Sequence, residues 1–201
     1  MNPTKPGIRK TICTLREQLT PEVRIAYSMA IMERLVQLPE YQRAGTVLGY
    51  MNFGAEFASE MWIAHVLAEG KRLVLPKVNR HTNCLDLYRV DDLDNQLVQG
   101  MWGIREPIVE RCGRVSTLNE VEFALLPGVA FTRNGMRLGY GGGFYDKLLA
   151  NPDGKKHTRQ PLLFAAAFAL QIVGYIPQEV TDVKVGWVVT EQEIITCPAQ
   201  E

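Results

Sequence analysis

The sequence predicts an α/β fold in which a mostly parallel sheet is covered by helices on both sides. Helical patterns alternate along the chain with short runs of β-branched and apolar residues. Several of these runs, such as residues 121–126, are apolar at successive positions, which is typical of strands buried on both faces. The chain has 201 residues, a length expected for one domain, and we expect residues 1–201 to form it.

Two helices are predicted at the N-terminal end. Residues 8–18 carry apolar side chains at helical spacing, and Pro6-Gly7 is expected to interrupt the helix before them. A second helix is predicted to begin after Thr20, whose hydroxyl can cap it, and to end at Pro39.

Strands and helices then alternate. Strands are predicted over residues 46–51, 72–78, 85–90, 121–126, 162–168 and 185–190. A helix capped by Ser59 and closed by Gly70 is predicted between the first two strands, and a short helix over 144–150. Residues 91–120 are predicted to form a long functional loop or a small subdomain, and residues 151–160 a mobile surface loop.

Composition excludes several classes of protein. The chain has 22 Lys plus Arg and 22 Asp plus Glu, so binding to nucleic acid through bulk charge is not expected. Its four cysteines form no C-x-x-C pair and its three histidines no H-E-x-x-H motif, which disfavours a zinc ribbon or a zinc protease. No signal peptide and no apolar stretch of 18 residues is present, so we expect a cytoplasmic protein without a membrane partner, and a monomer.

The most informative segment is a glycine-rich loop between a buried strand and a helix. Residues 137–146 read Arg-Leu-Gly-Tyr-Gly-Gly-Gly-Phe-Tyr-Asp, after an Asn134-Gly135 turn. Glycines allow backbone N–H groups to approach an anion closely, and the start of the following helix favours negative charge. Arg137 can add a charged donor to a phosphate, and Asp146 can hold Mg²⁺. These features predict a site for a nucleoside triphosphate.

The loop does not match either common nucleotide-binding fingerprint. G-x-G-x-x-G would need glycine at Phe144, and no Lys-Ser or Lys-Thr pair follows the glycines. A glycine-rich turn that only packs a helix closely against the sheet is therefore the simplest alternative.

The segment from Leu126 to Asp146 closely resembles the signature of the 5-formyltetrahydrofolate cyclo-ligase family. Lys5 and Arg9 fit the opening K-x-x-x-R pattern of that family. Residues 51–56 resemble its substrate strand and loop, and Gly-Ile-Arg-Glu-Pro at 103–107 resembles its G-I-x-E-P element.

The resemblance implies an ATP-dependent ligase that needs Mg²⁺ and converts 5-formyltetrahydrofolate to 5,10-methenyltetrahydrofolate, ADP and phosphate. It also implies a three-layer α/β/α sandwich related to the sheets of ribose-phosphate isomerase and CoA-transferase proteins. This fold agrees with the one that hydrophobic periodicity predicts.

The resemblance also implies roles for individual residues. Arg137 would act on the transferring phosphoryl group, and Asp146 would bind Mg²⁺; whether a second carboxylate such as Asp182 joins it stays open. The residues expected to bind ATP are Lys5, Arg9, Arg137, Leu138, Gly139, Tyr140, Gly141, Gly142, Gly143, Phe144, Tyr145 and Asp146. The residues expected to bind folate are Met51, Glu56, Trp102 and Tyr145.

Two other functions fit the same residues. A small-molecule kinase on this scaffold would turn over ATP with a substrate other than a folate. A non-catalytic folate- or nucleotide-binding module would bind without turnover. Many members of the family carry a carboxylate after a Lys-Val pair, but here Gly186 follows Lys184-Val185. The lack of this carboxylate favours the non-catalytic binding module as the alternative.

Overall fold

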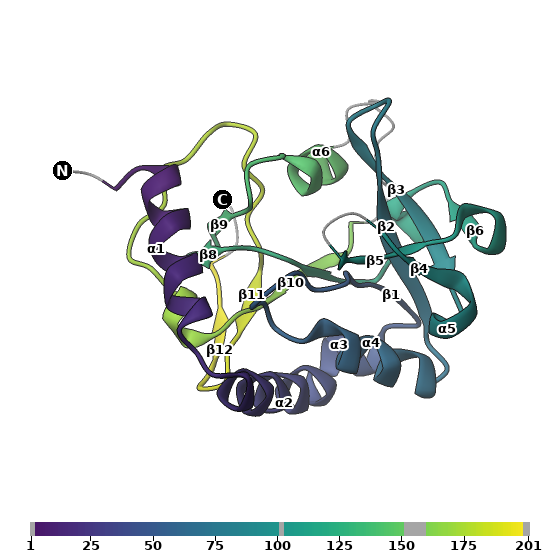
Figure 1. Cartoon of the computed structure of the whole chain (residues 1–201), viewed down its shortest axis with the longest axis horizontal. Coiled ribbons are helices and arrows are strands. Elements are labelled where there is room, and N and C mark those ends of the chain that lie inside the picture. The colour runs from purple at the N-terminus through teal and green to yellow at the C-terminus, as the bar shows by residue number, and fades with distance from the viewer. Residues whose placement is uncertain (1–2, 101–102, 151–159, 199–201) are drawn as a thin grey trace.

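The computed structural model describes residues 3–100, 103–150 and 160–198, and a large mixed sheet runs through it (Figure 1). Eight strands form this sheet, in the spatial order β12 (Ile194–Thr196), β11 (Trp187–Val189), β10 (Leu162–Ala166), β7 (Phe123–Leu126), β1 (Thr46–Leu48), β2 (Arg72–Asn79), β3 (Cys84–Val90) and β6 (Gly113–Val115).

The five central strands are parallel, and the edges of the sheet are antiparallel. Each neighbouring pair from β11 through β10, β7 and β1 to β2 is parallel. Strand β12 pairs antiparallel with β11 on one side, and β3 and β6 continue the other side antiparallel. The predicted α/β fold with a mostly parallel sheet is therefore confirmed.

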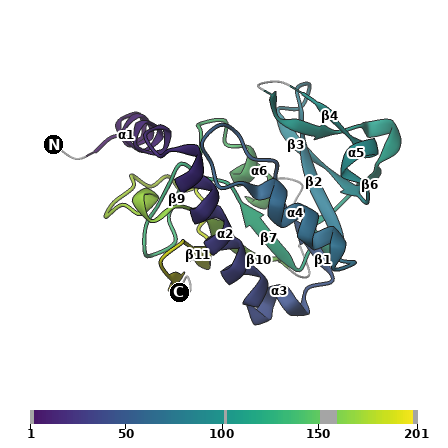
Figure 2. The ribbon, with the colours of Figure 1, turned by 60° about the horizontal axis from the view of Figure 1, so that its bottom comes forward.

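Helices lie on both sides of the sheet. Figure 1 shows α2 (Pro21–Gln37), α3 (Pro39–Arg43) and α4 (Ser59–Ala68) along one side and α6 (Phe144–Ala150) on the other. Helix α1 (Lys5–Glu17) lies apart from the central strands, beside β8 and β9 in Figure 1 and near β9 in Figure 2. The helices thus bury both faces of the sheet.

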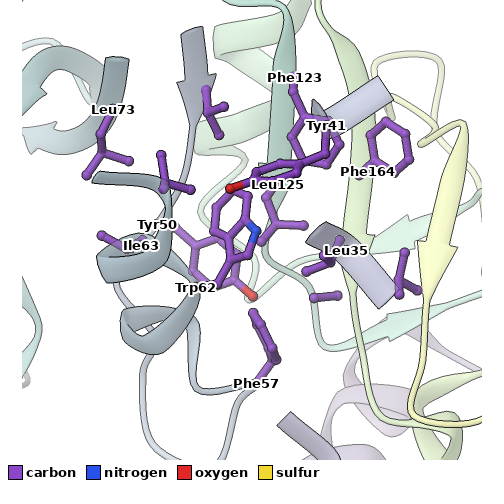
Figure 3. Close-up of a cluster of buried hydrophobic side chains, with 14 of the residues drawn as sticks. Leu35, Tyr41, Tyr50, Phe57, Trp62, Ile63, Leu73, Phe123, Leu125 and Phe164 are labelled. Atoms are coloured by element: carbon purple, nitrogen blue, oxygen red, sulfur yellow. The ribbon is translucent and has the colours of Figure 1, made fainter. Parts of the chain in front are cut away.

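Successive residues of the central strands serve two separate cores. Phe123 and Leu125 of β7 pack toward α2, α3 and α4, whereas Ala124 and Leu126 belong to the cluster that includes Leu149 of α6. Because side chains alternate across a strand, a run apolar at every position is what a sheet covered on both faces needs. Figure 3 shows the first of these cores.

The N-terminal helix begins earlier than predicted. It starts at Lys5, where the Thr4 hydroxyl accepts a hydrogen bond from the Gly7 N–H at 3.2 Å. Pro6 is tolerated because the first turn of a helix needs no N–H donor to a preceding carbonyl. The expectation that Pro6-Gly7 interrupts the helix is wrong.

Helix α4 is not capped by Ser59 as predicted. Ala58 occupies the cap position, and the Ser59 hydroxyl donates instead to the Tyr50 carbonyl, two residues beyond the end of β1 (Thr46–Leu48). This serine therefore ties α4 to the loop after β1.

Residues 91–120, predicted as a long functional loop or a small subdomain, carry several short elements, one of which joins the main sheet. They contain α5 (Leu93–Gln96), the antiparallel pair β4 (Leu97–Gln99) and β5 (Arg105–Pro107), the edge strand β6, and two 3-10 turns, η2 (Val109–Arg111) and η3 (Leu118–Glu120). The sequence pattern missed β12, the hairpin of β8 (Ala130–Phe131) and β9 (Arg137–Leu138), and the turn η4 (Ala169–Gln171).

The loop predicted over 151–160 lies, apart from Gln160, outside the described residues. Within the described ranges, none of the helices has both the length and the apolar character needed to cross a lipid bilayer.

Candidate functional site

A cavity of about 860 Å³ collects residues from distant parts of the chain. Every predicted site residue that the structure describes lines it: Lys5, Arg9, Met51, Glu56, Arg137, Leu138, Gly139, Tyr140, Gly141, Gly142, Gly143, Phe144, Tyr145 and Asp146. Trp102, the remaining predicted folate contact, lies outside the described residues. The volume is within the range usual for small-molecule sites.

A tight hairpin aims the glycine loop, residues 139–143, into this cavity. Strands β8 and β9 pair through Ala130–Leu138 and Phe131–Arg137, and the turn between them includes Gly135 with φ +85°. A Cβ at Gly135 would lie 2.3 Å from the Val185 carbonyl oxygen, so this turn needs glycine for space as well as for conformation.

The glycine loop lies against helix α1. The Arg9 Nε–H donates to the Gly139 carbonyl at 2.8 Å. Gly141 has φ +110°, a conformation that residues with a side chain rarely adopt, and a Cβ there would lie 3.6 Å from the Arg9 guanidinium carbon. The loop therefore presents bare backbone beside a positive charge.

Arg137 and Asp146 lie at the two ends of the glycine-rich segment 137–146, and their side chains bind each other. Arg137 Nη2 donates to Asp146 Oδ1 at 2.7 Å, and Arg137 Nη1 donates to the Pro127 carbonyl at 3.3 Å. The Val183 N–H also donates to Asp146 Oδ1, at 3.3 Å. Arg137 Nε is buried and has no hydrogen-bond partner among the described residues. The pair thus holds a buried cation at the cavity with one donor unsatisfied.

Glu56 is a buried carboxylate of the same cavity, bonded to a residue of the glycine loop. Its Oε1 accepts from the Tyr140 hydroxyl and its Oε2 from the Phe53 N–H, both at 2.7 Å. Arg16 Nη2 donates to the Tyr140 hydroxyl at 2.7 Å, and Arg16 Nη1 lies 3.9 Å from Glu56 Oε1. Burial raises the pKa of the Glu56 carboxyl above its ordinary value of 4.5, against the opposing effect of these hydrogen bonds and of Arg16.

Lys5 forms ion pairs with two carboxylates that line the same cavity. Its Nζ lies 2.9 Å from Glu179 Oε1 and 2.8 Å from Asp182 Oδ2. Burial acts to lower the pKa of Lys5, but the two carboxylates outweigh it and hold that pKa above its ordinary value. Asp182, which directly precedes the Val183 N–H donor to Asp146, therefore lines the cavity as a partner of Lys5.

An apolar wall completes the cavity. It consists of Tyr50, Met51, Pro76, Val78, Leu85, Ile104 and Phe144. Tyr145 also lines the cavity and lies beside Arg137, whose guanidinium carbon is 5.8 Å from the centre of the Tyr145 ring. Burial raises the pKa values of the Tyr50 and Tyr145 hydroxyls, so both stay protonated at neutral pH.

The sequence does not show that several other residues line the cavity. Tyr50, Pro76, Val78 and Leu85 are predicted only as strand residues. Arg16, which does not line the cavity but contacts Tyr140 and Glu56, is predicted only as part of a helix. Ile104 belongs to the G-I-x-E-P element, and the sequence predicts it only as an apolar anchor of residues 91–120. An apolar strand residue has the same pattern whether it faces a core or a cavity, so no local signal separates the two.

The fold and the cavity define an α/β protein in which one cavity combines a glycine loop and charged side chains with an apolar wall. Residues 1–191 match the model of the 5-formyltetrahydrofolate cyclo-ligase family. The chain belongs to this family, which confirms the predicted resemblance and the prediction of a ligase of folate metabolism.

Individual relatives and solved structures agree with this assignment. A 5-formyltetrahydrofolate cyclo-ligase of Escherichia coli K12 is 30% identical, over 89% of this chain and 96% of that protein. A probable 5-formyltetrahydrofolate cyclo-ligase of Caenorhabditis elegans is 28% identical, over 95% and 94%. The NMR structure of 5,10-methenyltetrahydrofolate synthetase from Aquifex aeolicus is 32% identical, covers 98% of this chain and 94% of its own, and has a TM-score of 0.82.

Proposed function

We propose that this protein converts 5-formyltetrahydrofolate and ATP to 5,10-methenyltetrahydrofolate, ADP and phosphate. The observation that carries the proposal is one cavity that joins the glycine loop and Arg137 to Glu56 and an apolar wall. Two substrates that exchange a phosphoryl group must lie in a single enclosed space, and this cavity offers a charged end and an apolar end.

The charged end suits the triphosphate of ATP. Four of the five residues 139–143 are glycines, whose backbone N–H groups can approach phosphate oxygens closely because these residues have no Cβ. Arg9 adds positive charge from α1, and the unsatisfied Nε of Arg137 adds a donor. In this role Arg137 stabilises the charge on the transferring phosphoryl group. Lys5 is paired with Glu179 and Asp182, so it would contribute to phosphate binding by exchanging these partners for the nucleotide.

The residues present fit Mg²⁺ bound together with the nucleotide. No three His, Cys, Asp or Glu side chains gather into a metal site in the part of the chain that the structure describes. Mg²⁺ is commonly held by one or two carboxylates together with substrate phosphates, and Asp146 beside the glycine loop supplies one carboxylate. The ion, when bound, would neutralise charge on the phosphates. Asp146 meanwhile keeps Arg137 oriented.

The apolar end suits the flat pterin ring. Met51, Tyr145 and the rest of the wall provide the apolar contact. Glu56 would accept hydrogen bonds from the pterin N–H groups or from N10. Its burial makes each such hydrogen bond strong, since little water competes for the carboxylate.

The reaction follows from the weak reactivity of the formyl group. The formyl carbon on N5 is part of an amide, so it is a poor electrophile. Transfer of the γ-phosphoryl group of ATP to the formyl oxygen releases ADP and leaves an iminium-like formyl phosphate. N10 then attacks the carbon, the five-membered ring closes, N10 loses its proton, and phosphate departs with the former formyl oxygen. The protein mainly positions the groups and neutralises charge.

The direct test is the absorbance of 5,10-methenyltetrahydrofolate formed from 5-formyltetrahydrofolate, ATP and Mg²⁺. We expect product that depends on each of the three. Folded protein that forms no product at high enzyme concentration would refute the proposal. ATP turnover stimulated only by a non-folate compound would instead indicate a kinase.

A further inference from the structure

One phenol hydroxyl joins the glycine loop to Glu56, the buried carboxylate of the cavity. Tyr140 lies in the glycine loop, and its hydroxyl donates to Glu56 Oε1 at 2.7 Å. The same hydroxyl accepts a hydrogen bond from Arg16 Nη2, also at 2.7 Å. The segment proposed to hold phosphates is therefore bonded directly to the carboxylate proposed to hold the folate.

The hydroxyl of Tyr140 is held more firmly than its ring. The residue is 47% exposed, whereas the side chains of Arg16 and Glu56 are each 5% exposed. Charged groups buried to this degree need partners, and the Tyr140 hydroxyl serves both, as acceptor for one and donor to the other. The ring contacts Phe53 edge-on, with centroids 6.3 Å apart, and the Arg16 guanidinium at 5.8 Å, while the two hydrogen bonds fix the position of the hydroxyl.

Helix α1 holds the glycine loop at two points. Arg9 bonds to the Gly139 carbonyl and Arg16 to the Tyr140 hydroxyl. The two arginines are seven residues apart, roughly two helical turns, and so lie on the same face of α1. A ligand that orders the glycine loop must therefore also order the Tyr140 hydroxyl.

Glu56 retains capacity for a ligand in this arrangement. An ionised carboxylate has roughly four acceptor positions. Tyr140 and the Phe53 N–H use one position on each oxygen. The two hydrogen bonds thus orient the carboxylate without saturating it.

We propose that Tyr140 and Arg16 are positioning residues that couple the binding of nucleotide to the binding of folate. The inference rests on the proposed function. A nucleotide in the glycine loop holds Tyr140 in place, and Tyr140 holds the Glu56 carboxylate toward the pterin. Such coupling is reciprocal, so folate tightens nucleotide binding by the same factor.

Isothermal titration calorimetry measures the coupling. The Kd of 5-formyltetrahydrofolate is determined with and without a saturating non-hydrolysable ATP analogue and Mg²⁺. In the unchanged protein we expect the analogue to lower this Kd by about 5-fold or more, as is typical of coupled sites. In Tyr140→Phe, which keeps the ring and removes the hydroxyl, the ratio of the two Kd values should fall close to one. Each ligand alone should still bind that variant.

Two further variants sharpen the result. Tyr175→Phe removes a hydroxyl from an exposed tyrosine that does not line the cavity, and it should keep the full ratio. Arg16→Met should lower the ratio as Tyr140→Phe does, and the double variant should lower it no further, because both changes break one chain of hydrogen bonds.

An unchanged ratio in Tyr140→Phe would overturn the inference, and so would a ratio of one in the unchanged protein. Loss of nucleotide binding by Tyr140→Phe in the absence of folate would also overturn it, since the hydroxyl would then be a direct ligand. Turnover by the same preparation separates this inference from the proposed function. An active enzyme without coupling refutes only the inference, whereas an inactive unchanged protein refutes the function.

Discussion

Arg137 Nη2 donates to Asp146 Oδ1 at 2.7 Å, so the cation and the carboxylate proposed for phosphoryl transfer are partners of each other. The Arg137 side chain is only 3% exposed, and an arginine this deep requires a neighbouring negative charge. Asp146 supplies that charge before any nucleotide binds. The pair therefore holds the arginine in place for its substrate.

Replacement of Arg137 by alanine should slow the reaction strongly. Loss of one charge donor in a transition state typically costs about 2–4 kcal/mol, which corresponds to a decrease in kcat of roughly 30- to 1000-fold. Steady-state assay of methenyltetrahydrofolate formation measures it. Arg133→Ala is the matched control, because Arg133 is exposed and pairs with Glu193 away from the cavity. A kcat for Arg137→Ala within threefold of the parent would remove Arg137 from its proposed role.

Asp146→Asn should raise the Mg²⁺ concentration needed for half-maximal rate by about tenfold or more, or abolish the rate. Asparagine keeps the shape of the side chain but removes the charge that attracts the ion. A Mg²⁺ titration of the rate at fixed ATP tests this. Asp91→Asn, at an exposed residue paired with Arg89, should leave the titration unchanged. If the two variants gave the same curve, Asp146 would not be a metal ligand.

Binding of folate should weaken on the acid side of neutrality through Glu56. Burial raises the pKa of this carboxyl above 4.5, so it takes up its proton at a higher pH than an ordinary glutamate. The protonated form accepts fewer hydrogen bonds. The affinity for 5-formyltetrahydrofolate should therefore be highest at pH values above this raised pKa, where Glu56 is ionised, and should decrease as the pH falls through the pKa.

Glu56→Gln tests the origin of that pH dependence. The variant should bind folate about tenfold or more weakly at neutral pH, because hydrogen bonds to a charged group contribute about 1.5–3 kcal/mol. It should also lose the acid-side decrease in affinity. Glu120→Gln, at an exposed residue paired with Arg72, should keep the full affinity at neutral pH and also the decrease at acid pH. A decrease that persists in Glu56→Gln would have to come from another group.

Gly141→Ala should weaken nucleotide binding. The residue has φ +110°, and a side chain there would strain the backbone by about 1–3 kcal/mol and stand beside Arg9. We expect the KM for ATP to rise by about fivefold or more, with the Kd for folate alone less affected. Gly174→Ala is the control, since a Cβ at Gly174 meets nothing within 4 Å. Equal KM values for ATP in the two variants would speak against a phosphate-binding loop.

Phe123→Ala should destabilise the fold without touching the cavity. The Phe123 ring is fully buried, stacks on Phe164 with centroids 4.3 Å apart and meets the edge of Tyr41 (Figure 3). Removal of such a ring typically lowers the free energy of unfolding by about 3–5 kcal/mol. Denaturant unfolding measures this, and Val180→Ala, at an exposed residue, should change it by less than about 0.5 kcal/mol.

The sequence by itself determined the α/β fold and most of the cavity's charged end. Runs such as Phe123–Leu126 are apolar at every position, and this pattern requires a sheet covered on both faces. The glycine loop, Arg137 and Asp146 are close in the sequence, so their proximity in space follows from a local strand, turn and helix. Helix boundaries were less well predicted, because Pro6 and Gly7 are read as breakers even where Thr4 caps the first turn.

Only the tertiary structure decided which distant residues meet. Arg16 reaches Tyr140 across 124 residues and Lys5 reaches Asp182 across 177. These contacts depend on the order of the strands and on where α1 packs, and no local pattern encodes either. The apolar wall, including Pro76 and Val78, has the same sequence pattern as buried strand residues elsewhere, so the cavity becomes visible only when the sheet and its loops are in place.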